Sequence, residues 1–454
     1  MLQSINPYSG AIIQSYKTDS KKIIQDKINE CREAFMEWRC ISLKERANYL
    51  ANLSRYLLEN KLEMAQMATD EMGKPISQSI AELEKCAITL SYYAEHAEQI
   101  LKEEKVKSEA KESFVTFEPL GTVLAIMPWN FPYWQVFRAM GPILISGNTM
   151  LLKHASNVTG CGHAIQKAMD SCKFPKGVFN FLQIKSEAVE AVIANEHVHA
   201  ITFTGSTTAG KKVAAVAGAH LKKQVLELGG SDAYIILDDA DLRLAAEVCA
   251  TSRLNNTGQS CIAAKRMIVL ESVAQKFERL LLEAFEERPF GDPTDIDTKV
   301  GTVARQDLRD ELHKQVEKSV ALGAKIVCGG YIPSGDAAFY PPTILTNVHK
   351  GMPAYDEELF GPVASIIVVK DEEEAVKVAN DTPFGLGAAI FSQDEKKAKK
   401  MATKSVESGS VFVNAMVSSN ALLPFGGIKQ SGYGRELSSY GVKEFVNIKT
   451  IYIK

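Results

Sequence analysis

The sequence has little of what marks specialised classes of protein. Its 454 residues include 8 cysteines without CxxC spacing, so we expect no disulfide scaffold and predict no metal site. The longest apolar stretches, GTVLAIMPW and GPILISG, are interrupted by Gly and Pro well before the length of a membrane span. The N-terminus lacks the charged segment and apolar run of a secretory signal. We therefore expect a cytoplasmic protein with no membrane partner.

The sequence also lacks an excess of positive or negative charge. The formal net charge is −3, and 46% of the residues are hydrophobic and 24% charged, which is the composition of an ordinary globular enzyme or binding protein. No basic excess suggests a nucleic-acid partner. A chain of this length is too long for one simple core, so we expect two sizeable lobes.

Alternating patterns predict an α/β protein. Residues 20–107 place apolar side chains at helical spacings of three and four. Strand-like segments then alternate with helical ones: TVLAIM, NTMLLK, VFNFLQ, HAITFTG, QVLELG and, from Ser231 on, AYIILDDA, RMIVLE, AKIVCGG and ASIIVVKD. This alternation favours βαβ units and parallel sheets in both lobes. The C-terminal VKEFVNIKTIYIK is a further strand that needs a partner, either the SFVTFE segment or another subunit.

Three residues suggest nucleophilic chemistry. Cys261 lies in NNTGQSCIAAKR, a Gly-containing turn between a helical and a strand-like segment. A lone cysteine is more often a buried core thiol, and a catalytic one needs a base and an oxyanion stabiliser. Glu227 ends a strand before two glycines, where a solvated charge is an equal alternative. Asn130, fixed between prolines and aromatics in MPWNFPYW, suits an oxyanion, although Asn is also common in turns.

A phosphate site is predicted at ITFTGSTTAGKKV. The segment is a strand, a turn at Gly205 and Ser206, and a helix start, which suits a pyrophosphate at the positive end of a helix dipole. Its spacing also mimics a Walker A loop, but Lys212 stands where Mg²⁺ binding requires Ser or Thr. No GxGxxG follows a strand-like segment, so a dinucleotide would be held in a less usual way.

Seven segments, in order, resemble the aldehyde dehydrogenase superfamily over essentially the full chain. They are PWNFP at 128–132, FTGS at 203–206, ELGG at 227–230, GQSC at 258–261, EELFGPV at 357–363, NDTPFGLGA at 380–388 and PFGGIKQSGYGRE at 424–436. The resemblance implies a Rossmann-type NAD(P)-binding domain (1–105 and 122–228), an α/β catalytic domain (229–418), and an oligomerisation hairpin with a tail strand (106–121 and 432–454). It also implies a homodimer or homotetramer.

The resemblance implies a mechanism and a cofactor. Cys261 would add to an aldehyde, Asn130 and the Cys261 N–H would hold the oxyanion, and Glu227 would activate water to hydrolyse the thioester. The residues expected to bind the cofactor are Trp129, Lys153, Ser156, Gly205, Ser206, Gly229, Glu358 and Phe360. Relatives that prefer NAD usually carry Glu where this chain has Ser156, so NADP should be tolerated and dual use is expected.

Further residues resemble the succinate-semialdehyde dehydrogenase branch. Arg138, six residues after Pro132, would clamp a carboxylate, although a surface or salt-bridging arginine is an alternative. Trp134 and Ser419 are expected beside it. No basic residue occurs in VSSNALLPFGG, which puts strict carboxylate selectivity in doubt, and Ala263 replaces a second cysteine of some branch members.

The sequence predicts oxidation of succinic semialdehyde to succinate with NAD(P)⁺. A broad-specificity aldehyde dehydrogenase is the main alternative. A non-catalytic relative, a P-loop hydrolase and a dehydrogenase that acylates coenzyme A are further alternatives. The retained Glu227 favours transfer of the acyl group to water rather than to coenzyme A.

Overall fold

A hairpin and four helices form the N-terminal part of the chain. The computed structural model describes residues 1–335 and 337–454. Strands β1 (Leu2–Ile5) and β2 (Ile12–Tyr16) pair antiparallel. Helices α1 (Lys21–Trp38), α2 (Leu43–Glu59), α3 (Lys61–Met72) and α4 (Ile76–Ile100) follow. Gly73 ends α3 with a left-handed φ of 73°. The predicted helices are present, but the last one ends at Ile100, and Glu104–Lys105 within the predicted helical range form a short strand.

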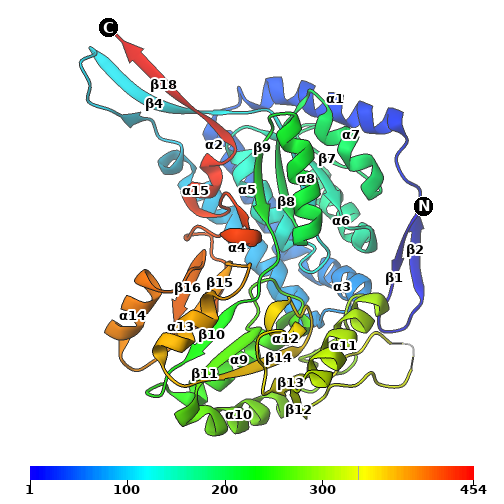
Figure 1. The fold of residues 1–454 in the computed structure, drawn as a ribbon. Coiled ribbons are helices and arrows are strands. Elements are labelled where there is room, and N and C mark those ends of the chain that lie inside the picture. Colours follow the sequence, from blue (N-terminus) through cyan, green and yellow to red (C-terminus); the bar gives the residue numbers. More distant parts are fainter. Residues whose placement is uncertain (336) are drawn as a thin grey trace.

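A six-stranded sheet occupies the upper half of the molecule in Figure 1. Its order is β17-β9-β8-β5-β6-β7, and only the β17 pairing is antiparallel. The strands are β5 (Thr122–Met127), β6 (Thr149–His154), β7 (Phe179–Phe181), β8 (Val198–Thr204), β9 (Lys223–Glu227) and β17 (Gly432–Tyr433). The helices between them are α5 (Trp134–Ile145), α6 (Thr159–Ser171), α7 (Val189–Ala194) and α8 (Thr207–Ala219).

The strand order of this sheet predicts where a ligand binds. From β5 the chain builds outward through β6 and β7, and then returns to the other side of β5 with β8 and β9. In open α/β sheets, ligands bind at the carboxyl ends of the strands where the order reverses. The segments that leave β5 and β8 at this position contain Trp129 and Asn130, and Gly205 and Ser206.

A seven-stranded sheet fills the lower half, in the order β12-β13-β14-β11-β10-β15-β16. Its strands are β10 (Ala233–Ile236), β11 (Arg266–Leu270), β12 (Lys325–Cys328), β13 (Thr343–Thr346), β14 (Val363–Val369), β15 (Gly387–Phe391) and β16 (Ser410–Val413). Its helices are α9 (Leu242–Leu254), α10 (Glu271–Glu286), α11 (Gln306–Ala321), α12 (Pro353–Asp356), α13 (Glu372–Asn380) and α14 (Glu395–Lys404). All pairings except β12 with β13 are parallel, so the expected α/β class is confirmed.

The C-terminal strand finds its partner within the chain. After the short helix α15 (Ser438–Lys443), β18 (Val446–Ile453) pairs antiparallel with the full length of β4 (Glu112–Pro119). The two-residue β3 (Glu104–Lys105) completes a three-stranded sheet, which projects from the body in Figure 1. Of the two alternatives, SFVTFE is the partner. Gly432 and Tyr433, within the predicted tail, pair with β9 instead; the domain boundaries stay a prediction.

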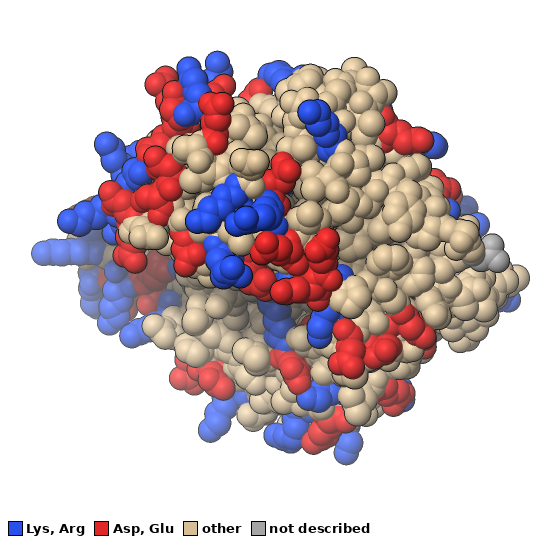
Figure 2. Space-filling model, turned by 90° about the horizontal axis from the view of Figure 1, so that it is seen from below, with Lys and Arg blue, Asp and Glu red and all other residues tan. Residues whose placement is uncertain are grey.

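Charged side chains of both signs are interspersed on the face shown in Figure 2, around a shaded hollow. None of the helices in the described part of the chain is both long and apolar enough to cross a bilayer.

Glu82 fixes α4 to the start of α5. Its Oε1 accepts hydrogen bonds from the N–H groups of Tyr133 (2.8 Å) and Trp134 (2.7 Å). Its Oε2 pairs with the Lys74 ammonium, and both side chains are buried, at 1% and 0% exposure. The Lys74 Nζ also lies 4.0 Å from the Phe131 ring centroid. This buried pair therefore determines where the first turn of α5 begins.

We predict that Glu82→Gln lowers the free energy of unfolding by ~3–5 kcal/mol, because Lys74 would remain buried without a counter-charge. Urea denaturation followed by tryptophan fluorescence measures the change. Glu84→Gln is the matched control on the same helix: its partner is Lys61, its side chain is 43% exposed, and its loss should cost less than about 1 kcal/mol. Equal losses for the two variants would contradict the assignment.

Candidate active site

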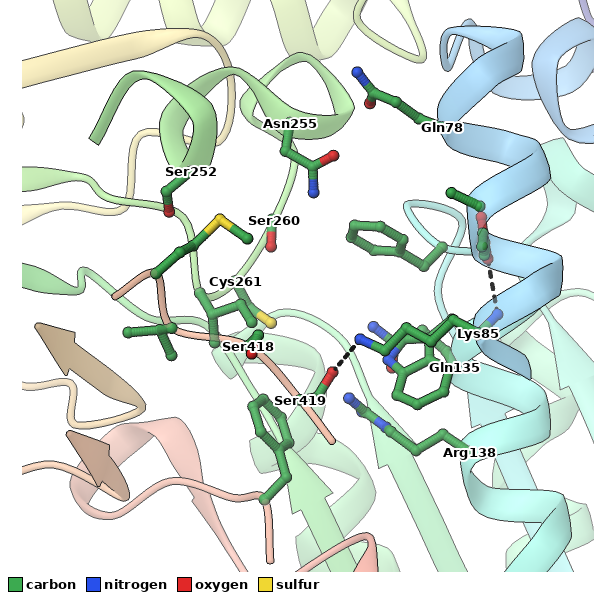
Figure 3. A pocket seen from close by; sticks show the side chains of 18 residues that line it. Gln78, Lys85, Gln135, Arg138, Ser252, Asn255, Ser260, Cys261, Ser418 and Ser419 are labelled. Carbon is green, nitrogen blue, oxygen red and sulfur yellow. Dashed lines mark hydrogen bonds between the residues drawn. The ribbon is translucent and has the colours of Figure 1, made fainter. Parts of the chain in front are cut away.

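A cavity of about 210 Å³ lies between α4, α5 and the loop before β11. Its wall contains four residues singled out in the sequence, Trp134, Arg138, Cys261 and Ser419 (Figure 3). Pockets for drug-sized ligands measure ~300–1,000 Å³, so this cavity suits a small substrate. The structure thus brings the predicted nucleophile and the three predicted substrate-binding residues to one place.

The loop that carries Cys261 has an unusual backbone. Asn256, Thr257 and Gly258 are consecutive residues with φ of 53°, 53° and 73°, in the left-handed region that residues other than glycine rarely adopt. At Gly258 a Cβ would lie 2.2 Å from the main-chain oxygen of Gly361, so only glycine fits. Strain of this kind persists where the surroundings hold it in place, and here it turns the chain so that Cys261 faces the cavity.

Asn130 holds this loop from the side of the six-stranded sheet. Its side-chain Nδ2 donates to the main-chain oxygen of Gln259 at 3.0 Å. Its own main-chain oxygen accepts from the Asn256 side chain at 2.6 Å. The residue is 5% exposed and is not among the described residues of the cavity wall. The structure places Asn130 against the nucleophile loop, and its role as oxyanion donor stays a prediction.

Arg253 joins the nucleophile loop to the EELFGPV segment. Its guanidinium donates to the main-chain oxygens of Gly258, Leu359 (3.3 Å) and Gly361 (2.6 Å), and the residue is fully buried. One guanidinium therefore donates hydrogen bonds to the carbonyls of two loops far apart in sequence. These bonds offset the cost of burying the carbonyl groups.

Lys265 makes a second link between these segments. Its ammonium donates to the main-chain oxygen of Cys261 at 2.7 Å and pairs with Glu358 at 3.1 Å. Glu358 also accepts from the N–H of Gly230 at 3.2 Å. At Gly229 a Cβ would lie 2.4 Å from the Glu358 carboxylate, so glycine is required there for this approach. Glu358 and Gly229, both predicted to bind cofactor, are thus neighbours.

Glu227 is buried at the end of β9, with 2% exposure. Its two carboxyl oxygens have no hydrogen-bond partner among the described residues. Burial raises the pKa of Glu227 well above its usual range, and the nearby Glu436 raises it further against the effect of Arg138. Glu227 is not among the described residues of the cavity wall; its carboxyl lies beside Gly426.

Glu436 is a functional candidate that the sequence analysis did not single out, although it ends the PFGGIKQSGYGRE motif. Its carboxylate pairs with the Arg138 Nε, and both side chains are almost fully buried. It also accepts from the Thr202 hydroxyl at 3.3 Å. Burial raises the pKa of Glu436, and Arg138 opposes the rise. Arg138 is therefore a salt-bridging arginine that also lines the cavity.

Lys85 is a second residue that the sequence did not reveal. It lies on α4, and nothing in the local sequence distinguishes it from a solvent-exposed lysine. In the structure it lines the cavity. Its Nζ donates to the Ser419 hydroxyl at 2.8 Å and lies 4.1 Å from the Trp134 ring centroid. Burial lowers the pKa of Lys85 to about 8, and the charge of Arg138 adds to this effect.

The segment predicted to bind phosphate folds as a strand, a turn and a helix start. β8 ends at Thr204, Gly205 follows, and Ser206 caps α8 by accepting from the N–H of Ala209 at 3.3 Å. The first N–H groups of a helix have no partner within the helix, and they favour anions. They lie at the carboxyl end of β8, where the strand order reverses. This arrangement fits the pyrophosphate of a dinucleotide.

The remaining cofactor candidates lie at the same edge of the sheet or on the facing loop. Lys153 is in β6 and Ser156 begins the short helix η1 (Ser156–Val158). Burial lowers the pKa of Lys153. The Trp129 and Phe360 rings meet edge to face with centroids 5.8 Å apart. Aromatic surface, a buried lysine and a helix N-terminus are a set of groups that fits a nicotinamide dinucleotide.

A cavity thiol beside a dinucleotide-type sheet is typical of a cysteine-dependent dehydrogenase. A profile of the Aldehyde dehydrogenase family matches residues 1–451. The chain belongs to the aldehyde dehydrogenase family, as its sequence motifs predicted.

Relatives and solved structures agree with this assignment. The chain is 45% identical to the succinate semialdehyde dehydrogenase [NAD(P)+] of Escherichia coli K12, over 99% of this chain and 97% of that protein. It is 43% identical to a probable succinate-semialdehyde dehydrogenase [NADP(+)] of Synechocystis, over 100% and 99%. The structure of succinic semialdehyde dehydrogenase from Streptococcus pyogenes with NADP⁺ matches with a TM-score of 0.97 at 36% identity, covering 100% of both chains.

The Cys261 thiol should react slowly at neutral pH. Burial raises its pKa to about 12, and Lys265 and Arg138 only partly oppose this. Because the thiolate is the nucleophile, iodoacetamide labelling of the cofactor-free enzyme should accelerate about tenfold per pH unit between pH 7 and 9. Peptide mass spectrometry measures the rate in a Cys40→Ser background, which removes an exposed thiol. A plateau below pH 9 would disprove the expected titration.

Proposed function

We propose that this protein oxidises succinic semialdehyde to succinate with NADP⁺ or NAD⁺. The observation that carries the proposal is a single small cavity with the Cys261 thiol, two cationic side chains, Lys85 and Arg138, and the Ser419 hydroxyl on its wall. A thiol reacts with an aldehyde, and cations with a hydroxyl bind a carboxylate. The names of the relatives support the same substrate.

In the proposed mechanism, Cys261 loses its thiol proton to solvent, and the thiolate sulfur adds to the aldehyde carbon. The Asn130 amide and the Cys261 N–H stabilise the negative oxygen; one Asn130 N–H is already bonded to Gln259, which fixes the direction of the amide. A bound NAD(P)⁺ would supply the hydride acceptor for this carbon, and Cys261 would then hold the acyl group as a thioester. Glu227 takes a proton from water, which attacks the thioester and releases succinate and the thiol. Burial raises the pKa of Glu227, which makes its carboxylate a stronger base than an exposed one.

The residues proposed to hold the cofactor are distributed along its length. Lys153 and Ser156 would contact the adenosine ribose, Gly205 and Ser206 the pyrophosphate, and Glu358 the nicotinamide ribose. Phe360, Trp129 and Gly229 would border the nicotinamide.

A hydroxyl at Ser156, with the Lys153 ammonium nearby in sequence, accommodates the 2′-phosphate of NADP⁺. We predict that Ser156→Glu lowers the ratio of kcat/KM for NADP⁺ to that for NAD⁺ by about tenfold, because a carboxylate repels the phosphate. Initial rates with each cofactor measure the ratio. An unchanged ratio would show that Ser156 does not face the phosphate.

The substrate is tested with a pair of aldehydes of equal chain length. The wild-type enzyme should have a kcat/KM for succinic semialdehyde about 10- to 100-fold above that for butanal. This is the factor that one hydrogen bond to a charged group contributes. Cys261→Ala should abolish both reactions. Equal values for the two aldehydes would instead favour the broad-specificity alternative.

We further propose a cytoplasmic homodimer or homotetramer. The edge strand β18 supports association, because Ile448 and Tyr452 are 57% and 51% exposed on it, and open edges favour pairing with another chain. All eight cysteines are free, which is usual in a reducing compartment.

A further inference from the structure

The charge of Arg138 is already balanced inside the protein. Its Nε pairs with Glu436, its Nη2 is 3.5 Å from the Thr204 hydroxyl, and its guanidinium carbon lies 5.0 Å from the Phe425 ring centroid. A substrate carboxylate that met only this arginine would compete with a buried glutamate. The cavity therefore needs another cation if it selects a carboxylate.

Lys85 is positioned to be this second cation, and the nearest carboxylates on its helix do not balance its charge. The two acidic residues nearest to it on α4 are engaged elsewhere: Glu82 with Lys74 and two α5 N–H groups, and Glu84 with Lys61. Among the described residues, no carboxylate forms an ion pair with the Lys85 ammonium. Figure 3 shows Lys85 and Arg138 pointing toward the same part of the cavity, with Ser419 between them and Cys261 beyond it.

The bond between Lys85 and Ser419 leaves donors available. The lysine Nζ donates to the serine oxygen at 2.8 Å, so the hydroxyl hydrogen of Ser419 is free to donate to a third group. An ammonium has three hydrogens, of which this bond uses one. The pair thus offers hydrogen-bond donors from both residues, and the face of Trp134, 4.1 Å from Nζ, holds the ammonium in position.

We infer that Lys85 and Ser419 together form the subsite that binds the carboxylate of the substrate, and that Lys85 supplies the charge that distinguishes a semialdehyde acid from an uncharged aldehyde. This inference rests on the proposed function. It assigns to α4 a role in substrate choice, while Arg138 mainly balances Glu436 and lines the cavity wall.

The first test compares variants at Lys85 with both aldehydes. Lys85→Met keeps the length of the side chain and removes its charge, so kcat/KM for succinic semialdehyde should fall about 10- to 100-fold, chiefly through a higher KM. The value for butanal should fall several-fold less. Lys85→Arg should restore most of the preference. The exposed Lys102, just beyond α4, gives the control Lys102→Met, which should leave the ratio of the two values unchanged.

The second test uses pH and does not depend on the Met variant folding. The groups whose charge acts on the Lys85 ammonium are Glu82 and Cys86 of α4, Arg138 of α5 and Cys261. Lys85 is cationic below its pKa of about 8 and neutral above it. The wild-type ratio of kcat/KM for succinic semialdehyde to that for butanal should therefore fall as pH rises through 8 and 9, whereas Lys85→Arg should keep it constant. Both aldehydes react with Cys261, so its titration changes both kcat/KM values by the same factor and leaves their ratio unchanged.

The outcomes separate this inference from the proposed function. If the wild-type enzyme does not prefer succinic semialdehyde, the proposed function fails. If the wild-type enzyme has the preference and Lys85→Met keeps it, the function stands and the subsite is wrong. Equal losses for both aldehydes, or a pH-independent ratio in the wild type, would also overturn the assignment, because they would indicate a structural role for Lys85.

Discussion

The buried ion pair between Arg138 and Glu436 connects α5 to the C-terminal segment, and the electrostatics of the site depend on it. Such a pair adds little net stability, because desolvation offsets its attraction. Its main effect is to hold the Arg138 and Glu436 charges inside the protein. The pair compensates Glu436 but leaves Glu227 beside it without a hydrogen-bond partner among the described residues. Burial raises the pKa of Glu227, Glu436 raises it further, and Arg138 opposes the rise. Lys85 is the cavity cation that has no carboxylate partner among the residues that the structure describes.

The second constraint is the satisfaction of main-chain carbonyls by buried cations. Arg253 and Lys265 each link the loop that carries Cys261 to the EELFGPV segment. Without such donors the left-handed turn at Asn256 and Thr257 would be unfavourable, because strain and unpaired polar groups would add. A rigid nucleophile loop thus results from charge held in the interior, and Glu358 connects that charge to the proposed cofactor site.

Much of this architecture was predictable from sequence, and the exceptions have physical causes. Strands rich in β-branched residues, such as β5 and β11, were predicted closely. The short β13 and β16, and β15 with GAAIF, were missed because small residues and brief runs carry little strand signal. Cys261 was identified by its motif and Arg138 by its spacing. The importance of Lys85 and Glu436 arises from partners far away in the sequence, which no local pattern contains.

The late position of Glu436 in the chain has a consequence for synthesis on the ribosome. Arg138 is translated early, but its counter-charge follows only after well over half of the chain has been added. Until then a nascent α5 has a cation that cannot be buried at low cost, and Lys85 has not yet met Ser419. The cavity can therefore assemble only after nearly the whole chain has emerged, so that unfinished chains cannot carry out the chemistry on their own.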